Sequence, residues 1–424
     1  MELLQIAAVR GKGRAGEINK ERAAHGLYQR YVLPCATLKE KGMAGREFKS
    51  SSRRISLFLF GSGHRAMLFH LGALQRLNEF ALLGKLSLIS SVSGGSIVAG
   101  ILAANWTSLN FDSNGVARKF EELVPKLVRK LASSNLESPG RIAAMSLKKW
   151  VTNPAPSRYQ ELVGKVLLAE LPKPPGQPEF VFKATNLQTG GMWSFFRSRI
   201  GDRFVGEITD PRLELATVIA ASACLPPQLP VVLNPASIGN WTNAGADRFR
   251  THEFRHRIIL CDGSVSWEPD FLPTSAVDIS LVSDAGALYL SGPRPGLHWL
   301  NSRFSALTLS DVHSYERRKR EWPVKLGKLK LTKAYWDISN DIKAYGAKDA
   351  LECPPERTKG LAEVRTGFAA VDDAQQNDLI DWGFASCDAA VRACFGEFEL
   401  QSPDCSPNGS FCRRAPATAA ATAA

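Results

Sequence analysis

The sequence predicts an α/β fold of three layers, in which a central sheet carries helices on both faces. Between residues 56 and 396, short apolar segments of strand length alternate with longer segments whose apolar residues recur at helical spacing. No internal repeat accompanies this alternation. Strands and helices that alternate along a chain are typical of a sheet with helices packed against it.

The first predicted strand covers residues 56–60, and the leucines that follow it, up to residue 82, recur at helical spacing. Residues 86–90 form a second strand, and residues 97–106 a largely apolar second helix. The charge-free stretch 86–111 is long enough to span a bilayer, but five serines before Ile97 and a pair of glycines interrupt it. We therefore interpret it as strand, tight turn and helix.

The rest of the chain continues the alternation. A proline interrupts the amphipathic segment 116–131, where we expect a kink. Helices are predicted over 116–131, 157–171, 213–222, 301–320 and 372–396, and strands over 180–184, 258–260 and 277–282.

The sequence divides into a basic N-terminal segment, a main domain and a C-terminal tail. Residues 1–54 contain twelve Lys and Arg against five Asp and Glu, so seven of the twelve net positive charges lie there. A mobile basic arm of this kind favours anionic membrane surfaces or nucleic acid, and a solvated leader without a partner is the alternative. We expect the main domain over 55–396 and a disordered low-complexity tail over 397–424.

The eight cysteines are scattered, without a C-x-x-C pair or neighbouring histidines. This spacing argues against a zinc site and is typical of a reducing compartment. No secretory signal is recognisable near the N-terminus. The sequence therefore predicts a cytoplasmic protein, with peripheral membrane contact through the basic arm.

The loop after the first strand, Gly61-Ser62-Gly63-His64-Arg65-Ala66, fits two kinds of site. Gly-x-Gly-x-x-Ala between a strand and a helix occurs in dinucleotide-binding sites, and the same fan of N–H groups forms oxyanion holes. A dinucleotide site needs an acidic residue at the end of the second strand, whereas the nearest acid, Glu79, lies inside the preceding helix. This disfavours a nicotinamide-dependent oxidoreductase and favours an oxyanion hole.

The second strand is followed by Ser91-Val92-Ser93-Gly94-Gly95-Ser96, which is close to the G-x-S-x-G nucleophile elbow. An elbow lifts a serine hydroxyl out of the sheet, and small neighbours relieve the crowding of the turn. An ordinary tight turn is the alternative. A glycine loop after one strand and an elbow after the next would bring a nucleophile to ready-made N–H donors.

A nucleophilic serine needs a base, and Asp262 is the best candidate because it directly follows a buried strand and precedes Gly263. An ordinary Asp-Gly turn is the alternative. The apolar strand would help to raise the pKa of a carboxyl group, which is about 4 in water, toward that of a useful base. The histidines after residue 200 have no loop context that marks them as a base: His252, His256, His298 and His313.

With these motifs the sequence resembles the patatin-like phospholipase family, especially its bacterial cytoplasmic branch, over residues 56–393. The specific segments are "GSGHRAMLFHLGAL", "SSVSGGS" and "IILCDGS". The resemblance implies a patatin-like sheet and a serine acyl hydrolase that forms an acyl-enzyme with a Ser–Asp dyad, without cofactor or metal. Carried over by motif, the nucleophile is Ser93, the base is Asp262, the oxyanion hole is formed by Gly61, Ser62 and Gly63, and Arg65 is the basic residue of the loop.

The sequence departs from the family pattern at Ser62, the middle of the glycine loop, at Ser91, the start of the elbow, and at Ser264, after Asp-Gly. The changes at Ser62 and in the Asp-Gly segment favour an alternative function, a lipid-binding or regulatory protein with a degenerate site, whereas the change at Ser91 is common in this branch of the family. If the loop needs a positive φ at Ser62, the side chain would turn one N–H donor away, and Ser62→Gly would raise activity. The other possibility is that the Ser62 hydroxyl itself donates to the oxyanion.

The apolar, helix-rich surroundings of the motifs favour a lipid or fatty-acyl ester as substrate. We expect no nucleic acid partner.

Overall fold

The computed structural model describes residues 54–136, 155–225, 230–244, 246, 248–266, 278–286, 309, 312–321, 332–395, 400 and 402–414. All of them belong to one compact unit, Ala44–Ala424. The predicted basic arm, apart from Arg54, and the candidate His298 lie outside the described residues.

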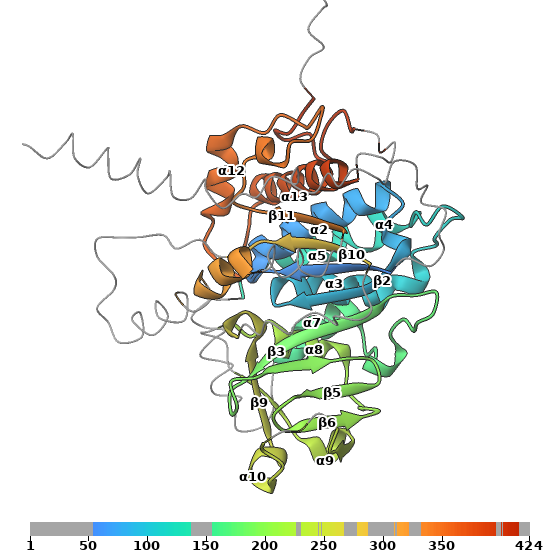
Figure 1. Cartoon of the computed structure of the whole chain (residues 1–424), viewed down its shortest axis with the longest axis vertical. Coiled ribbons are helices and arrows are strands. Elements are labelled where there is room, and N and C mark those ends of the chain that lie inside the picture. Colours follow the sequence, from blue (N-terminus) through green and yellow to red (C-terminus); the bar gives the residue numbers. More distant parts are fainter. Residues whose placement is uncertain are drawn as a thin grey trace, which may run out of the picture. The chain divides into compact units, whose positions relative to one another are not determined.

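One sheet organises the molecule, and five of its strands run parallel in the order β11-β10-β1-β2-β3 (Figure 1). Four short antiparallel strands extend the sheet beyond β3 in the order β4-β5-β6-β8. The parallel strands are β1 (Ile55–Phe60), β2 (Leu86–Val92), β3 (Glu179–Asn186), β10 (Ile279–Asp284) and β11 (Thr332–Asp337). The antiparallel strands are β4 (Met192–Phe195), β5 (Arg199–Asp202), β6 (Gly206–Thr209) and β8 (Asn240–Thr242).

Strand β9 (Ile258–Asp262) pairs antiparallel with β3, and β7 (Val231–Leu233) pairs with β9. Strand β2 pairs with β3 as far as Lys183, and β9 pairs with β3 from Ala184 onward. Because β4 occupies the other edge of β3 at Ala184, β9 continues the edge that β2 leaves. The C-terminal ends of β2 and β9 therefore meet.

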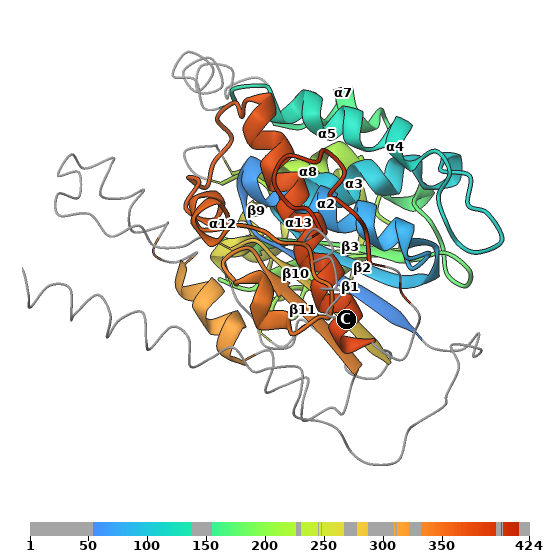
Figure 2. The ribbon, with the colours of Figure 1, turned by 90° about the horizontal axis from the view of Figure 1, so that it is seen from above.

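Helices flank both faces of this sheet. The larger core lies on the face covered by α2 (Gly63–Glu79), α3 (Gly94–Asn105), α8 (Leu215–Ser222) and α13 (Asp373–Cys394), several of which Figure 2 shows crossing the strands. A smaller apolar cluster that includes Phe58 and Phe60 lies on the other face. There the guanidinium of Arg318, from the helical residues 312–321, lies 5.1 Å from the centre of the Phe60 ring. This arrangement confirms the predicted α/β fold.

A buried ion pair fastens α13 to α2. Arg76 Nη2 lies 2.7 Å from Asp388 Oδ1, and Arg392 donates to the other oxygen of the same carboxylate at 2.7 Å. Asp388 is fully buried, and two arginines offset the cost of removing its charge from water.

Several predicted boundaries differ from the structure. The segment 116–131 forms two helices, α4 (Phe120–Leu123) and α5 (Pro125–Ala132), because Pro125 has no N–H and starts a new helix at its first position. Helix α7 (Ala155–Val163) ends before Gly164, which has a φ of 68°. The charge-free stretch 86–111 forms β2, a turn and α3, as predicted. Nowhere in the described ranges is a helix long and apolar enough to cross a membrane.

The chain after residue 397 departs from the predicted disorder wherever the structure describes it. The buried carboxylate of Asp381, on α13, accepts hydrogen bonds from the main chain and side chain of both Asn408 and Ser410. Cys353 and Cys412 form a disulfide across 59 residues, in contrast to the reduced thiols expected from the sequence. The wide spacing of the two cysteines gave no signal of this pairing. Residues 402–414 are therefore attached to the main domain.

Candidate active site

The glycine loop between β1 and α2 uses positive φ at its two glycines and not at its serine. Gly61 has a φ of 130° and Gly63 a φ of 77°, whereas Ser62 is extended, with φ −107° and ψ 153°. A side chain at Ser62 therefore costs no backbone strain. The expectation that Ser62 distorts the loop is wrong, because the positions that require glycine still have it.

The elbow between β2 and α3 holds Ser93 in a strained conformation, with φ 52° and ψ −118°. Such a conformation costs about 1–3 kcal/mol in a non-glycine residue and persists only where its surroundings enforce it. Gly94 allows the loop and the elbow to approach, because a Cβ there would collide with the carbonyl of Gly63. Ser93 thus lies at the N-terminus of a twelve-residue helix and beside the glycine loop.

Ser93 and Asp262 are in direct contact. Ser93 Oγ donates a hydrogen bond of 2.6 Å to Asp262 Oδ2, and both residues are fully buried. The sheet produces this contact, because Ser93 follows the last residue of β2 and Asp262 is the last residue of β9. The candidate nucleophile and the candidate base, which are 169 residues apart in sequence, are thereby brought into contact.

The other oxygen of Asp262 is held by its own turn. Asp262 Oδ1 accepts the main-chain N–H of Ser264 at 2.9 Å and the Ser264 hydroxyl at 2.8 Å. The main-chain carbonyl of Asp262 accepts from Thr185 Oγ1 at 2.9 Å. These contacts leave Oδ2 directed at Ser93.

Behind the elbow lies a group of serines whose roles the sequence did not reveal. Ser222, at the end of α8, accepts the Ser93 N–H at 3.0 Å and donates to the Lys183 carbonyl at 2.6 Å. Ser96 donates to Ser91 at 3.0 Å. Ser91, which replaces the first glycine of the elbow, thus has a hydrogen-bonding role. In the sequence Ser222 is marked only as the last residue of the predicted helix 213–222.

The loop offers main-chain donors toward the elbow. His64 N–H is bonded to the carbonyl of Gly367 at 2.9 Å, whereas the N–H groups of Ser62 and Gly63 have no hydrogen-bond acceptor within the described part of the chain. Such donors at the start of α2 are what a developing oxyanion requires.

Arg65 forms hydrogen bonds to the segments that pack against the glycine loop. Its buried guanidinium donates to the carbonyls of Ala285, Ala362 and Val364 at 2.8–3.1 Å. The Ala285 carbonyl also packs against Gly61, where a Cβ would collide with it. The structure therefore gives Arg65 a bracing role rather than a position facing the nucleophile.

The surroundings of Asp262 are poor in water. Burial, together with the charge of Asp262, raises the pKa of the Cys224 thiol well above its usual value. The same causes raise the pKa of Cys261 to about 12. Both thiols stay neutral near the dyad at physiological pH, and a site of this kind strengthens hydrogen bonds to a developing charge.

None of the described histidines is hydrogen-bonded to Ser93. His252 and His256 stack on each other at an exposed helix, α10 (His252–Arg255), and His313 is exposed. His64 and His70 are buried in α2 and bond to the carbonyls of Ala369 and Phe60. Among the residues with described positions, no group of three or more His, Cys, Asp or Glu is placed to hold a metal.

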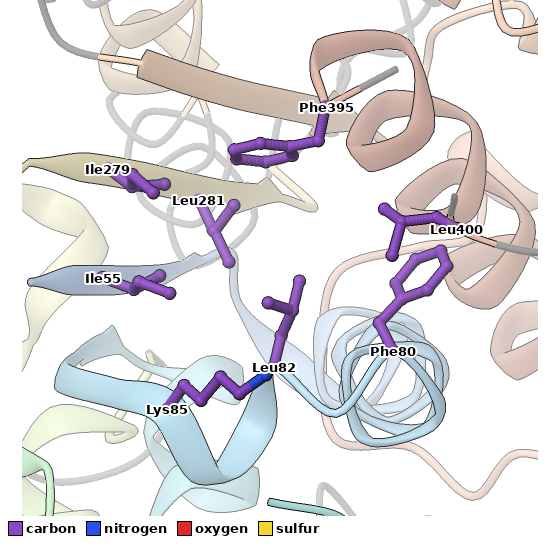
Figure 3. A pocket seen from close by; sticks show the side chains of 8 residues that line it. All are labelled: Ile55, Phe80, Leu82, Lys85, Ile279, Leu281, Phe395 and Leu400. Carbon is purple, nitrogen blue, oxygen red and sulfur yellow. The ribbon is translucent and has the colours of Figure 1, made fainter. Parts of the chain in front are cut away.

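A cleft of about 660 Å³ opens beside the Asp262 turn. Six of its ten lining residues are polar and two of these are basic: Thr185, Asn186, Leu187, Gly190, Val265, Ser266, Leu309, His313, Ser314 and Arg317. A smaller apolar pocket of about 140 Å³ lies where β1 and β10 begin, at the end of the strands opposite the elbow (Figure 3). Its lining is Ile55, Phe80, Leu82, Lys85, Ile279, Leu281, Phe395 and Leu400.

Comparison with known proteins agrees with these motifs. The family model described as patatin-like phospholipase matches residues 58–269, which is half of the chain and includes the loop, the elbow and the Asp-Gly turn. The chain belongs to the patatin-like phospholipase family. None of the curated proteins matches the sequence.

Solved structures similar to this member of the family include human GIVD cytosolic phospholipase A2, in complex with a methyl γ-linolenyl fluorophosphonate inhibitor and terbium chloride. It is 13% identical with a TM-score of 0.44, and the match covers 92% of this chain and 64% of that one. VipD from Legionella pneumophila is 14% identical with a TM-score of 0.36, and the match covers 81% of this chain and 67% of that one. The chain thus spans less than two thirds of the length of the human enzyme.

Proposed function

We propose that this protein is a serine acyl hydrolase that cleaves fatty-acyl esters of lipids through a Ser93–Asp262 dyad. The observation that carries the proposal is the 2.6 Å hydrogen bond from Ser93 Oγ to Asp262 Oδ2 at a strained turn beside unbonded main-chain donors. Family membership supports a lipid ester as the substrate.

In the proposed reaction, Asp262 Oδ2 takes the proton of Ser93 while Ser93 Oγ attacks the ester carbonyl carbon. The carbonyl oxygen becomes an oxyanion, which the N–H groups of Ser62 and Gly63 stabilise. The proton then passes to the leaving alcohol as the acyl–oxygen bond breaks, which leaves an acyl-enzyme on Ser93. Water repeats the sequence, releases the fatty acid and restores the dyad.

We propose that the substrate binds in the cleft beside the Asp262 turn. Val265 and Ser266 continue the chain from the Asp262 turn into its lining, and Thr185 connects the same lining to the Asp262 carbonyl. An ester in this cleft would lie beside the turn that carries the proposed base.

A fluorophosphonate probe tests the proposal directly, because it reacts covalently with an activated serine. We expect the full chain to be labelled at Ser93 and to hydrolyse a short-chain p-nitrophenyl ester, and Ser93→Ala to lose both properties. Ser280→Ala is the matched control, since Ser280 in β10 is buried and its hydroxyl has no hydrogen-bond partner among the described residues. A folded wild-type protein that is neither labelled nor active would instead support a lipid-binding protein with a degenerate site.

We also propose peripheral contact with anionic membranes through the basic residues 1–53. Removing these residues keeps Arg54, whose carbonyl accepts the N–H groups of Asp278 and Ile279 at the start of β10. The shortened chain should retain its turnover of a soluble ester but bind phosphatidylserine vesicles more weakly, with a difference that salt removes. Equal vesicle binding by both chains at low salt would contradict a membrane role for the arm.

We propose a cytoplasmic location, where protein disulfides are rare. In that location the Cys353–Cys412 disulfide would have to form in a reducing environment. Mass spectrometry of the alkylated protein, taken directly from cells, would show whether these two thiols are paired, and a fully paired protein would argue for an oxidising compartment.

A further inference from the structure

Two of the three positions at which this chain departs from the family pattern contact each other. Ser62 of the glycine loop and Ser264 of the Asp-Gly turn lie 202 residues apart in sequence, and their hydroxyl oxygens are 2.9 Å apart. Both side chains are buried, with exposed fractions of 0% and 2%. A buried hydroxyl without a partner is costly, so each serine satisfies the other.

The direction of each hydrogen bond follows from the number of protons. A hydroxyl has one proton, and that of Ser264 is donated to Asp262 Oδ1 at 2.8 Å, so Ser264 accepts the proton of Ser62. The result is a directed chain in which Ser62 donates to Ser264 and Ser264 donates to Asp262. Ser93 donates to the opposite oxygen of the same carboxylate.

From this geometry we infer that Ser264 is a positioning residue for Asp262 and that Ser62 acts on the base through Ser264. The inference rests on the proposed function, since it assigns a role in the same reaction. The Ser62–Ser264 pair would keep the oxyanion loop and the base in one relative position. The hydroxyl of Ser264 holds Asp262 Oδ1 so that Oδ2 faces Ser93, and Ser62 orients that hydroxyl.

The backbone of Ser62 supports this role over a damaged loop. Its extended conformation is open to any residue, so the side chain is present without strain at the one loop position that tolerates it. The Ser62 hydroxyl points to Ser264 rather than serving as a third oxyanion donor. The two serines therefore form a matched pair and are not independent departures from the family pattern.

The test compares Ser62→Ala, Ser264→Ala and the double variant in ester hydrolysis by the full chain. Ser264→Ala should lower kcat roughly 10- to 100-fold with little change in KM, because a displaced base loses most of its advantage. Ser62→Ala should lower kcat about 3- to 10-fold. The double variant should be no slower than Ser264→Ala alone, since Ser62 acts only through Ser264. Losses that multiply, or a Ser62→Ala variant as fast as wild type, would overturn the inference.

The pH profile separates positioning from a general loss of structure. A hydrogen bond donated to a carboxylate favours its charged form, so Ser264→Ala should move the acid limb of kcat/KM to higher pH, by about half a unit or more. Ser264→Thr keeps a hydroxyl and should restore the wild-type limb. A lower rate with an unmoved limb would mean that Ser264 is merely structural.

A stability cycle tests the pair even if the wild-type protein proves inactive, which would contradict the proposed function alone. In urea, the shift of the unfolding midpoint for the double variant should be smaller than the sum of the two single shifts, because the second change removes a contact already lost. Additive shifts would show that Ser62 and Ser264 are not coupled. Ser280→Ala reports the effect of deleting a buried hydroxyl for which the described part of the chain offers no partner.

Discussion

Ala184 in β3 pairs with Asp262 in β9, one residue beyond the pairing of Lys183 with Val92 in β2. The strand that carries the candidate base thus continues the edge of β3 that the strand before the nucleophile vacates. Main-chain hydrogen bonds, rather than a loop, fix the separation of Ser93 and Asp262. A base held in this way needs no histidine to orient it.

Asp262→Asn should lower kcat by roughly three orders of magnitude, as the loss of the base does in other serine hydrolases. The amide has nearly the shape of the carboxylate, so the turn and its contacts with Ser264 should survive, whereas the capacity to accept the Ser93 proton is lost. Initial rates with a short-chain ester measure the effect, and circular dichroism verifies the fold.

The histidines provide the matched comparison. His252→Asn, His256→Asn and His313→Asn change exposed residues, and His298→Asn completes the set of candidates. Each should retain most of the wild-type rate. One histidine variant as inactive as Asp262→Asn would replace the dyad by a triad.

Ser222→Ala should impair both the stability and the rate. It leaves the buried N–H of Ser93 without its hydrogen-bond acceptor and removes the bond to the Lys183 carbonyl, and an unsatisfied buried group costs about 1–3 kcal/mol. It also removes a contact that holds Ser93 in its strained conformation, so we expect kcat to fall about tenfold or more. Urea unfolding and kcat together check this, with Ser280→Ala as the control. A variant with wild-type kcat would show that Ser222 does not support the elbow.

The three motifs of the candidate site could be predicted because each lies in a contiguous segment whose glycines and apolar flanks are visible in the sequence. The loop at Gly61, the elbow at Ser93 and the turn at Asp262 are of this kind. Contacts between segments left no such signal. Nothing in the sequence links Ser62 to Ser264 or Ser222 to Ser93, because their pairing depends on the register of the strands.

The secondary structure was likewise predicted where a pattern lies within one segment and missed where it depends on distant segments. Strands β1, β2, β3, β9 and β10 were predicted within a few residues, whereas the helix predicted over 157–171 ends at Val163. Strands β4 to β8 were missed because they have three or four residues each and are stabilised by neighbouring strands rather than by a pattern of their own. The six-residue β11 was missed too. The attachment of residues 402–414 was missed because it depends on Asp381 and Cys353, both of which lie outside this segment.

Stability should fall at acid pH because of two buried histidines. Burial lowers the pKa of His64 to about 4 and that of His70 to about 3, from 6.5 in the unfolded chain. The unfolded state therefore binds more protons below pH 6.5, so the stability that these neutral side chains contribute is complete above that pH and is lost as the pH falls toward 4 and 3. At pH 5 each should cost about 2 kcal/mol relative to pH 7.5.

The variant His70→Gln isolates one of these contributions. In neutral His70, Nε2–H donates to the Phe60 carbonyl at 3.1 Å and Nδ1 accepts from Ser283 at 2.8 Å. A glutamine at this position does not titrate, so its hydrogen bonds are the same at low and at neutral pH. Urea unfolding at pH 7.5 and pH 5 should show about 2 kcal/mol less acid destabilisation in the variant than in wild type. An unchanged difference between the two pH values would mean that His70 is protonated in the folded protein.

The tail attachment gives the last prediction, Cys412→Ser. Without the disulfide, the 59-residue separation between Cys353 and Cys412 is no longer closed in the unfolded chain, so the unfolding free energy should fall by about 2–4 kcal/mol. The same decrease should follow when wild type is unfolded in dithiothreitol, and the reductant should have no further effect on the variant. Cys405→Ser is the matched control, because Cys405 lies in the same segment as an exposed free thiol. Fluorophosphonate labelling should proceed equally in all three proteins, since neither cysteine contacts Ser93 or Asp262. A wild-type midpoint that does not respond to the reductant would show that the hydrogen bonds from Asn408 and Ser410 to Asp381 hold the tail without help from the disulfide.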